Sequence, residues 1–308
     1  MIKQLYHACM LIAILSIVSC QKKDAPPVIP PPVTDSSHVK IPKTPFKVAY
    51  YAFDATPNVL PLTNFATEAN VVVLFEGTAW EMADSVHYGK SDSYILTVNP
   101  NYHSYKSILS HVRTLQKAGV KVLMNVDDAN TWNTATPFTD YQGKGLNYQQ
   151  FAAFVKACIT DSLHLDGIAL DVEHMANTPA NSNFISLIKE LGKYYGPLSP
   201  DSNYTIYTAA IYTGGRAGYA IGQSPDVAKY LNFVQDMGYF QNNVTRFYRW
   251  SDSIGAAKTM IGVAKVYNTL TNAKAAATWH PAVGSKAGIM VYAGNVDSGY
   301  TNATFRAL

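Results

Sequence analysis

Eight short apolar runs recur along this chain, with helical patterns between several of them. The runs span residues 46–53, 70–75, 120–126, 167–173, 204–211, 232–239, 259–264 and 287–292. Segments with apolar residues at helical spacing cover residues 104–118, 148–162 and 183–195, and a short one covers 226–230. Strands that alternate with helices predict βα units and a parallel sheet. Eight strands over about 260 residues have the size of a closed α/β (β/α)8 TIM barrel. We therefore expect a single barrel domain at residues 46–308.

The fourth run, 167–173, carries two carboxylates on an otherwise apolar segment. Successive side chains of a strand point to opposite faces, so Ala169, Asp171 and Glu173 are expected to share one face. Burying an unpaired carboxylate is costly, so two of them at the end of a core strand indicate a pocket that uses them. Glycoside hydrolysis needs such a pair, because one acid donates a proton while the other stays ionised. From these residues alone, a solvated loop start, a helix cap and a metal ligand pair also remain open.

The same residues carry a family resemblance. The stretch Asp166-Gly-Ile-Ala-Leu-Asp-Val-Glu173 resembles the D-G-x-D-x-D-x-E signature of glycoside hydrolase family 18, with Ala169 in place of the middle aspartate. The family comprises chitinases and endo-β-N-acetylglucosaminidases. Its retaining mechanism uses the acetamido oxygen of the substrate as the nucleophile. The resemblance implies that Glu173 is the general acid and base and that Asp171 orients the acetamido group. The alanine removes a carboxylate that would otherwise share a proton with Asp171.

Other strand ends match the same family in part. The stretch Asp236-Met-Gly-Tyr239 resembles its M-x-Y motif, which implies a catalytic role for Tyr239 in binding the acetamido carbonyl. Tyr292 matches the aromatic floor under the sugar, and Asn125 begins a turn where the family often has S-x-G-G. Alternation places Gln235, Met237 and Tyr239 on one face. Residues expected to contact the substrate are Tyr292, Gln235, Met237, Asp236, Asn125, Phe75 and Tyr51. Each aromatic taken singly is also consistent with simple barrel packing.

The first 45 residues predict export rather than structure. Lys3 and the apolar run 8–18 are typical of a signal peptide, because the run is too short to span a membrane. Ser19-Cys20 resembles a bacterial lipoprotein signal, which implies cleavage of residues 1–19 and lipid attachment to Cys20. The segment 21–24 resembles the export tag of Bacteroidetes surface lipoproteins, although a short polar linker has the same composition. The proline-rich part of 20–45 is expected to be an extended tether. We thus expect an outer membrane lipoprotein on the cell surface or the periplasmic face.

Composition limits the alternatives. The net charge of +3 comes from scattered lysines and gives no electrostatic footprint for nucleic acid. The 21 tyrosines offer apolar faces with polar tips, which suit sugar rings. Three cysteines give no disulfide framework, and Cys158 is expected to be a small buried side chain in a helix. Histidine spacing indicates no metal site, and neither a metal nor another cofactor is expected.

The leading hypothesis is an anchored, monomeric endo-β-N-acetylglucosaminidase that acts on the chitobiose core of N-glycans. Residues 183–200 are similar to the helix that follows the motif in Bacteroidetes endo-β-N-acetylglucosaminidases, and no insertion of the chitinase type is apparent. A surface glycan-binding lipoprotein without turnover is the second hypothesis, favoured by Ala169 and the altered turn after Asn125. A chitinase is the third.

Overall fold

The computed structural model describes residues 39–56, 60–75, 94–127, 138–140, 143–173, 178–212 and 225–308. The predicted signal peptide, Cys20 and most of the tether lie outside the described residues. So do Asp128, His174 and most of the loops at 130–146 and 214–223.

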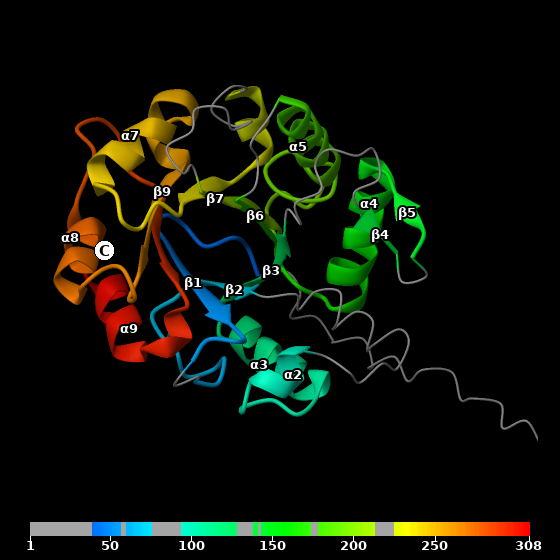
Figure 1. The fold of residues 1–308 in the computed structure, drawn as a ribbon, viewed down its shortest axis with the longest axis horizontal. Coiled ribbons are helices and arrows are strands. Elements are labelled where there is room, and N and C mark those ends of the chain that lie inside the picture. The colour runs from blue at the N-terminus through cyan, green and yellow to red at the C-terminus, as the bar shows by residue number, and fades with distance from the viewer. Residues whose placement is uncertain are drawn as a thin grey trace, which may run out of the picture.

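Eight parallel strands close into a barrel in the order β1-β10-β9-β8-β7-β6-β3-β2 (Figure 1). Pairing of β1 with both β2 and β10 closes the ring. This confirms the predicted TIM barrel, with strand bounds close to those expected. The strands are β1 Phe46–Ala52, β2 Val71–Phe75, β3 Lys121–Asp127, β6 Gly167–Val172, β7 Ile206–Ile211, β8 Phe233–Asp236, β9 Thr259–Ala264 and β10 Gly288–Tyr292.

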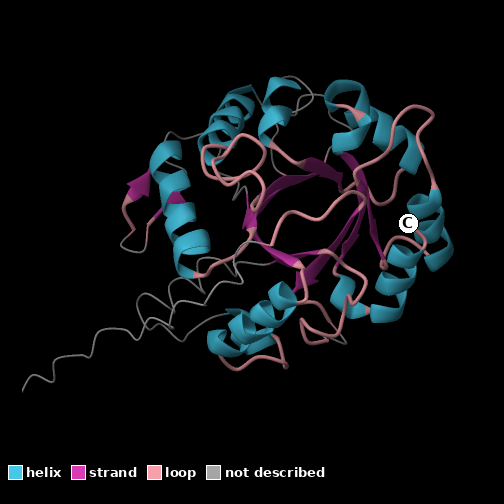
Figure 2. Cartoon of the chain, turned by 180° about the vertical axis from the view of Figure 1, so that it is seen from behind, coloured by secondary structure: helices cyan, strands magenta, loops and turns pink. Residues whose placement is uncertain are grey.

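Helices surround the sheet on its outer face (Figure 2). They are α2 Tyr94–Val98, α3 Tyr105–Lys117, α4 Tyr148–Val155 with its π-helical continuation η1 Lys156–Ser162, α5 Thr178–Leu191, η2 Pro225–Tyr230, α7 Asn243–Ile254, η3 Ala256–Lys258, α8 Leu270–Thr278, η4 Gly294–Val296 and α9 Ser298–Arg306. The short strands β4 Phe138–Thr139 and β5 Gly145–Leu146 pair outside the barrel. No helix in this described part of the chain is long and apolar enough to cross a membrane.

The sequence pattern did not predict α7, α8 and α9. In α8 the buried positions are all alanines, Ala273, Ala276 and Ala277, so the apolar stripe is weak. Cys158 is buried at 2% exposure, as expected, although the segment around it is π-helical.

The core has two layers because both faces of a parallel barrel sheet are covered. One layer lies between the strands and the helices. The other fills the barrel lumen with alternate strand residues, which include Phe46, Val48, Tyr50, Val73, Leu123, Ala169, Phe233 and Met290. A strand residue can therefore reach the barrel mouth only if it lies on the lumen face.

The first two residues of the acidic motif are structural. Gly167 has φ of 145°, and a Cβ atom there would lie 1.9 Å from the carbonyl oxygen of Ile206. The Asp166 carboxylate accepts hydrogen bonds from Lys121 Nζ at 3.0 Å and from Val122 N at 2.9 Å. These contacts fasten the start of β6 to β3, and they leave the later residues of the motif for the opposite end of the barrel.

Candidate active site

Polar side chains gather in the lumen near the carboxyl ends of the strands. Asn125 on β3, Asp171 on β6 and Gln235 on β8 alternate with residues of the outer layer, so they face the lumen. Asp171 is 7% exposed and Gln235 is fully buried. Gln235 Nε2 donates to Thr208 Oγ1 on β7 at 3.1 Å, which fixes the amide orientation. The sheet thus brings three predicted site residues to one place.

Aromatic rings surround this polar group. Tyr50 and Phe75 lie with ring centroids 5.8 Å apart, and Tyr292 lies 5.4 Å from Phe75. Tyr239 stacks against Tyr292 at 5.9 Å with an interplanar angle of 24°. Since β10 is four strands from β6 in either direction around the barrel, Tyr292 stands across the lumen from Asp171. Aromatic rings together with a carboxylate are the groups that suit contact with a sugar, and we call this cluster of lumen residues the chamber.

Several buried polar atoms of this chamber lack a hydrogen-bond partner among the described residues. They are Tyr50 Oη, Tyr239 Oη, Asn125 Oδ1 and Gln235 Oε1. The Gln235 side-chain amide lies close enough to the Tyr50 hydroxyl to lower its pKa, but the two groups are not in hydrogen-bonding geometry. Buried polar groups without partners are costly. A polar ligand in the lumen would supply hydrogen-bond partners for these two hydroxyls and two amide oxygens.

The tyrosine hydroxyls stay protonated in the folded protein. Burial raises the pKa of Tyr50 well above its usual range, and the nearby Asp171 carboxylate raises it further. Burial likewise raises the pKa of Tyr239, with smaller contributions from Tyr50, Tyr292 and Asp171. Both hydroxyls are therefore available as hydrogen-bond donors at neutral pH.

These shifts predict a loss of stability in alkali. A tyrosine whose pKa is raised by folding contributes stability that is fully present below the unfolded pKa of about 10 and falls as pH rises above it. The free energy of unfolding, measured with urea between pH 8 and 11, should decline above about pH 10, and less so in Tyr50→Phe and Tyr239→Phe. Variants that decline as steeply as the wild type would show that neither hydroxyl is held neutral by the fold.

Glu173 lies at the mouth of the chamber. It follows β6 directly and is exposed, whereas Asp171 on the strand is buried. Asn125 is the register neighbour of Ala169, and Asp127 is that of Asp171. Ala169 thus places a methyl group on the lumen face where the family motif has a carboxylate, next to the Asn125 position of β3. Within the described residues, no three His, Cys, Asp or Glu side chains gather as a metal site would need.

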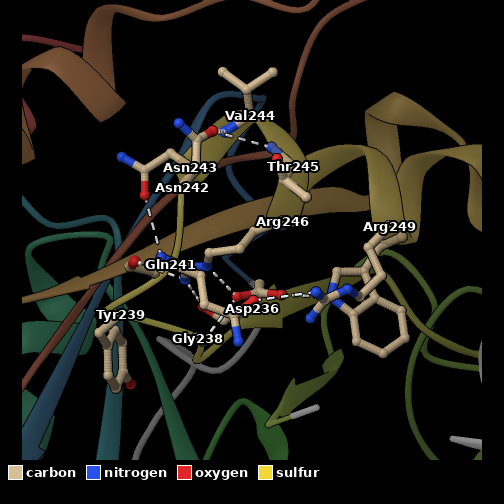
Figure 3. A network of polar contacts seen from close by, with 12 residues as sticks. Asp236, Gly238, Tyr239, Gln241, Asn242, Asn243, Val244, Thr245, Arg246 and Arg249 are labelled. Atoms are coloured by element: carbon tan, nitrogen blue, oxygen red, sulfur yellow. Dashed lines mark hydrogen bonds and ion pairs between the residues drawn. The ribbon is translucent and has the colours of Figure 1, made fainter. Parts of the chain in front are cut away.

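Asp236 corrects one prediction, because it points away from the lumen and into the helix layer (Figure 3). Its carboxylate pairs with Arg246 of α7 and accepts from Trp250 Nε1 at 2.7 Å and from the Gly238 N–H at 2.8 Å. Arg246 is fully buried. Asp236 is thus occupied by internal donors and lies outside the lumen.

The same network sets the position of Tyr239. Because β8 ends at Asp236, Met237 and Tyr239 reach the lumen through a turn rather than by strand alternation. Arg246 Nη2 donates to the carbonyl of Asp236 at 2.7 Å, and its guanidinium lies 6.0 Å from the Tyr239 ring. Asn268 Nδ2 donates to the carbonyl of Tyr239 at 2.9 Å. Contacts from α7 and from the segment after β9 therefore hold this tyrosine in the chamber.

Tyr51 corrects a second prediction. It packs in the outer layer with Phe53, Phe65 and Tyr102, and its hydroxyl accepts from Asn99 Nδ2 at 3.2 Å. Its neighbour Tyr50 faces the lumen instead. Sequence analysis missed Tyr50 because both faces of 46–52 are apolar or aromatic, so period-two alternation does not mark the lumen face. The lumen face of β1 can be identified only when β1 pairs with β2, because this pairing sets Ala52 beside Phe75 in the lumen.

The chain matches a family model over residues 93–291, described as the TIM-barrel domain of the endo-β-N-acetylglucosaminidase EndoS. This chain belongs to that family. The match covers well over half of the chain and includes β6 and β8, which carry Asp171 and Gln235, and it ends at residue 291, one residue before Tyr292. The strands that carry Asp171 and Gln235 thus belong to the EndoS-type barrel.

One curated protein and two solved structures are similar to this chain. Endo-β-N-acetylglucosaminidase F2 of Elizabethkingia meningoseptica is 26% identical over 239 residues, which are 70% of this chain and 64% of that protein. The chain thus aligns with less than two thirds of the relative's length. An endo-β-N-acetylglucosaminidase from Cordyceps militaris superimposes with a TM-score of 0.61 at 19% identity, covering 86% of this chain and 91% of the other. A chitinase-like agglutinin from Robinia pseudoacacia gives 0.56 at 13% identity, covering 85% and 99%. These two structures share the fold.

Proposed function

We propose that this protein is an endo-β-N-acetylglucosaminidase that cleaves the β-1,4 bond of the chitobiose core of N-glycans. The observation that carries the proposal is the chamber, in which Asp171 lies among tyrosine hydroxyls and amide oxygens that lack partners within the described residues. Membership of the EndoS-type family supports the reaction class. The relative F2 bears the name of the same activity.

The proposed chemistry uses the substrate's own acetamido group. Its oxygen attacks C1, the bond between C1 and the glycosidic oxygen breaks, and Glu173 gives its proton to that oxygen. Asp171 and the Tyr239 hydroxyl hold the acetamido group during the attack. Water then adds to C1 of the oxazolinium intermediate, the bond between C1 and the acetamido oxygen breaks, and the Glu173 carboxylate takes the proton from water. The exposed mouth position of Glu173 suits both transfers, and Tyr292 supplies the floor under the ring.

The test is incubation of the purified chain with a high-mannose glycoprotein and a complex-type glycoprotein, with released glycans analysed by mass spectrometry. Glycans that end in one GlcNAc are the expected product. Release of chitobiose from chitin oligomers, with no action on N-glycans, would instead identify a chitinase. Intact glycoproteins and intact chitin oligomers would contradict the hydrolase.

A glycan-binding protein without turnover is the second candidate. Ala169 favours it, because Asp171 lacks the strand neighbour whose carboxylate completes the family motif. The barrel fold is compatible with either outcome, since an agglutinin and an enzyme both adopt it. Binding of N-glycans without their release would establish this alternative.

We also propose that Cys20 carries lipid and anchors a monomeric barrel to the outer membrane, at the cell surface or on the periplasmic face. The support is the Ser19-Cys20 signal and the proline-rich tether. Several acyl chains on one cysteine provide stable anchoring. Fractionation of cells that express the wild type and Cys20→Ala tests this, since the variant should leave the membrane fraction.

A further inference from the structure

The segment that precedes β1 crosses the closed end of the barrel. Ile41 donates its backbone N–H to the carbonyl of Asn203 at 2.9 Å, just before β7, and Phe46 donates to the carbonyl of Ala287 at 2.8 Å. Since β7 and β1 are four strands apart around the ring, residues 41–46 run from one side of the barrel to the other. The Ile41 side chain packs against the lumen layer on the way. Segments that precede the strands lie opposite the barrel mouth, so this crossing covers the end that faces away from the chamber.

The crossing also fixes where the proline-rich tether joins the domain. The described residues begin at Val39, close to the start of β7, and residues 20–38 precede it. Nineteen residues in a fully extended polyproline conformation would span at most about 60 Å. A tether of that reach permits any orientation of the barrel on a membrane. The surface chemistry of the barrel therefore decides which end is turned toward the lipid.

We call the closed end the base face, which comprises residues 39–47 and the turns 196–203 and 280–286. Lysines without an ion-pair partner in the described part of the chain gather at this end, and they include Lys40, Lys43, Lys47, Lys117 and Lys229. The acids at this end are mostly paired, as in Glu68 with Arg306, Asp161 with Lys156, Asp166 with Lys121 and Glu190 with Lys193. Lys40, Lys43 and Lys47 lie outside helices, so attraction to a helix dipole does not account for them. The base face thus carries an excess of positive charge, whereas the mouth carries the Asp171 and Glu173 carboxylates.

Exposed apolar side chains lie on the same face as these lysines. Val283 is 83% exposed in the turn before β10, and Leu198 is 55% exposed in the turn before β7. Apolar and basic side chains on one face suit the boundary of an anionic membrane. The apolar groups enter the headgroup region, and the ammonium groups pair with lipid phosphates.

We propose that the base face lies on an anionic lipid surface and that the barrel mouth, with Asp171 and Glu173, is thereby turned outward. A lipid surface is the partner because the tether joins the domain at this face and Cys20 is the proposed site of the acyl chains. Basic side chains add an electrostatic contact to the acyl anchor. The inference rests on the proposed lipid anchor, and it does not depend on glycosidase activity.

The test is lysine acetylation followed by mass spectrometry at low conversion. The full chain is isolated from the membrane fraction of expressing cells. It is then reconstituted into vesicles of phosphatidylcholine alone or of phosphatidylcholine mixed equally with phosphatidylglycerol. Acetylation of Lys40, Lys43 and Lys117 should be about fivefold slower or more on the anionic vesicles than on the neutral ones. Lys106 near the start of α3 and Lys144 in the β4–β5 hairpin are exposed and follow strands on the mouth side, so their rates should change less than about twofold.

Charge reversal separates the base face from net charge. In Lys40→Glu combined with Lys43→Glu, Lys117 should regain the acetylation rate that it has on neutral vesicles. The matched control is Lys106→Glu combined with Lys144→Glu, which changes the net charge equally and should leave the protection of Lys117 in place. All four substituted side chains are exposed, so both variants keep the core.

Equal protection of all these lysines, no protection of the base face, or the same result in both double variants would overturn the proposed orientation. A protein that does not float with either kind of vesicle would overturn the lipid anchor as well. Glycan release is measured on the same samples. Its failure would overturn the enzyme alone, because the acetylation pattern does not require turnover.

Discussion

Replacing Glu173 with glutamine is expected to lower kcat on N-glycans by about 10³-fold or more while glycan binding persists. Glutamine keeps the size and polarity of the side chain but neither donates the proton to the leaving oxygen nor accepts one from water. Both halves of the proposed reaction therefore fail. The measurement is glycan release by mass spectrometry, together with the Kd of the same glycopeptide by calorimetry.

The matched control for this substitution is Glu68→Gln, which removes the same charge at the opposite end of the barrel. Glu68 precedes β2, and its pairing with Arg306 at 3.4 Å joins partly exposed side chains. Activity within about twofold of the wild type is expected, since exposed pairs contribute little. Full turnover in Glu173→Gln would remove Glu173 from the mechanism, and a parallel loss in Glu68→Gln would attribute the effect to net charge.

Replacing Asp236 with alanine is expected to destabilise the fold by about 3–5 kcal/mol, because it leaves the Arg246 charge buried without its partner. The Trp250 and Gly238 N–H groups lose their acceptor as well. The measurement is urea unfolding followed by tryptophan fluorescence. Asp161→Ala is the matched control, since Asp161 pairs with Lys156 in an exposed ion pair and should cost no more than about 1 kcal/mol. Equal effects of the two alanines would contradict the network as a source of stability.

A milder change separates positioning from folding. Trp250→Phe removes one donor to Asp236 and keeps the aromatic packing, so it should cost about 1–3 kcal/mol and leave a folded protein. Because the network sets the turn that carries Tyr239, kcat should fall more than KM rises. A variant that loses stability with unchanged kcat and KM would show that the network supports the fold without positioning Tyr239.

The barrel was predictable because its evidence is local. Each strand is a short apolar run, and the parallel strands of a closed sheet are covered on both faces, so the runs stand out in the sequence. The acidic motif was readable for a related reason, since Asp171 and Glu173 are polar residues at the end of an apolar run. Short helices rich in alanine, such as α8, were not predictable, because small side chains pack closely without a strong apolar stripe.

The face of each residue was not predictable from the same runs. In β1 the two tyrosines are equivalent in sequence, yet Tyr50 faces the lumen and Tyr51 packs under the helices. In β8 the adjacent Gln235 and Asp236 take opposite roles. The amide reaches the chamber, and the carboxylate pairs with Arg246 ten residues later. Where both faces of a strand are buried, alternation separates two sets of residues but does not indicate which set faces the lumen.

The fold class, the acidic motif at the end of the fourth barrel strand and the family could all be read from the amino-acid sequence, because they depend on local patterns of residues. The set of side chains that share the chamber follows instead from closure of the barrel. Tyr50, Asp171, Tyr239 and Tyr292 lie on four strand ends far apart in the chain, and ring closure in one register brings them together. The base face has the same origin, since residues 39–47 and the turns before β7 and β10 come together only when the ring closes.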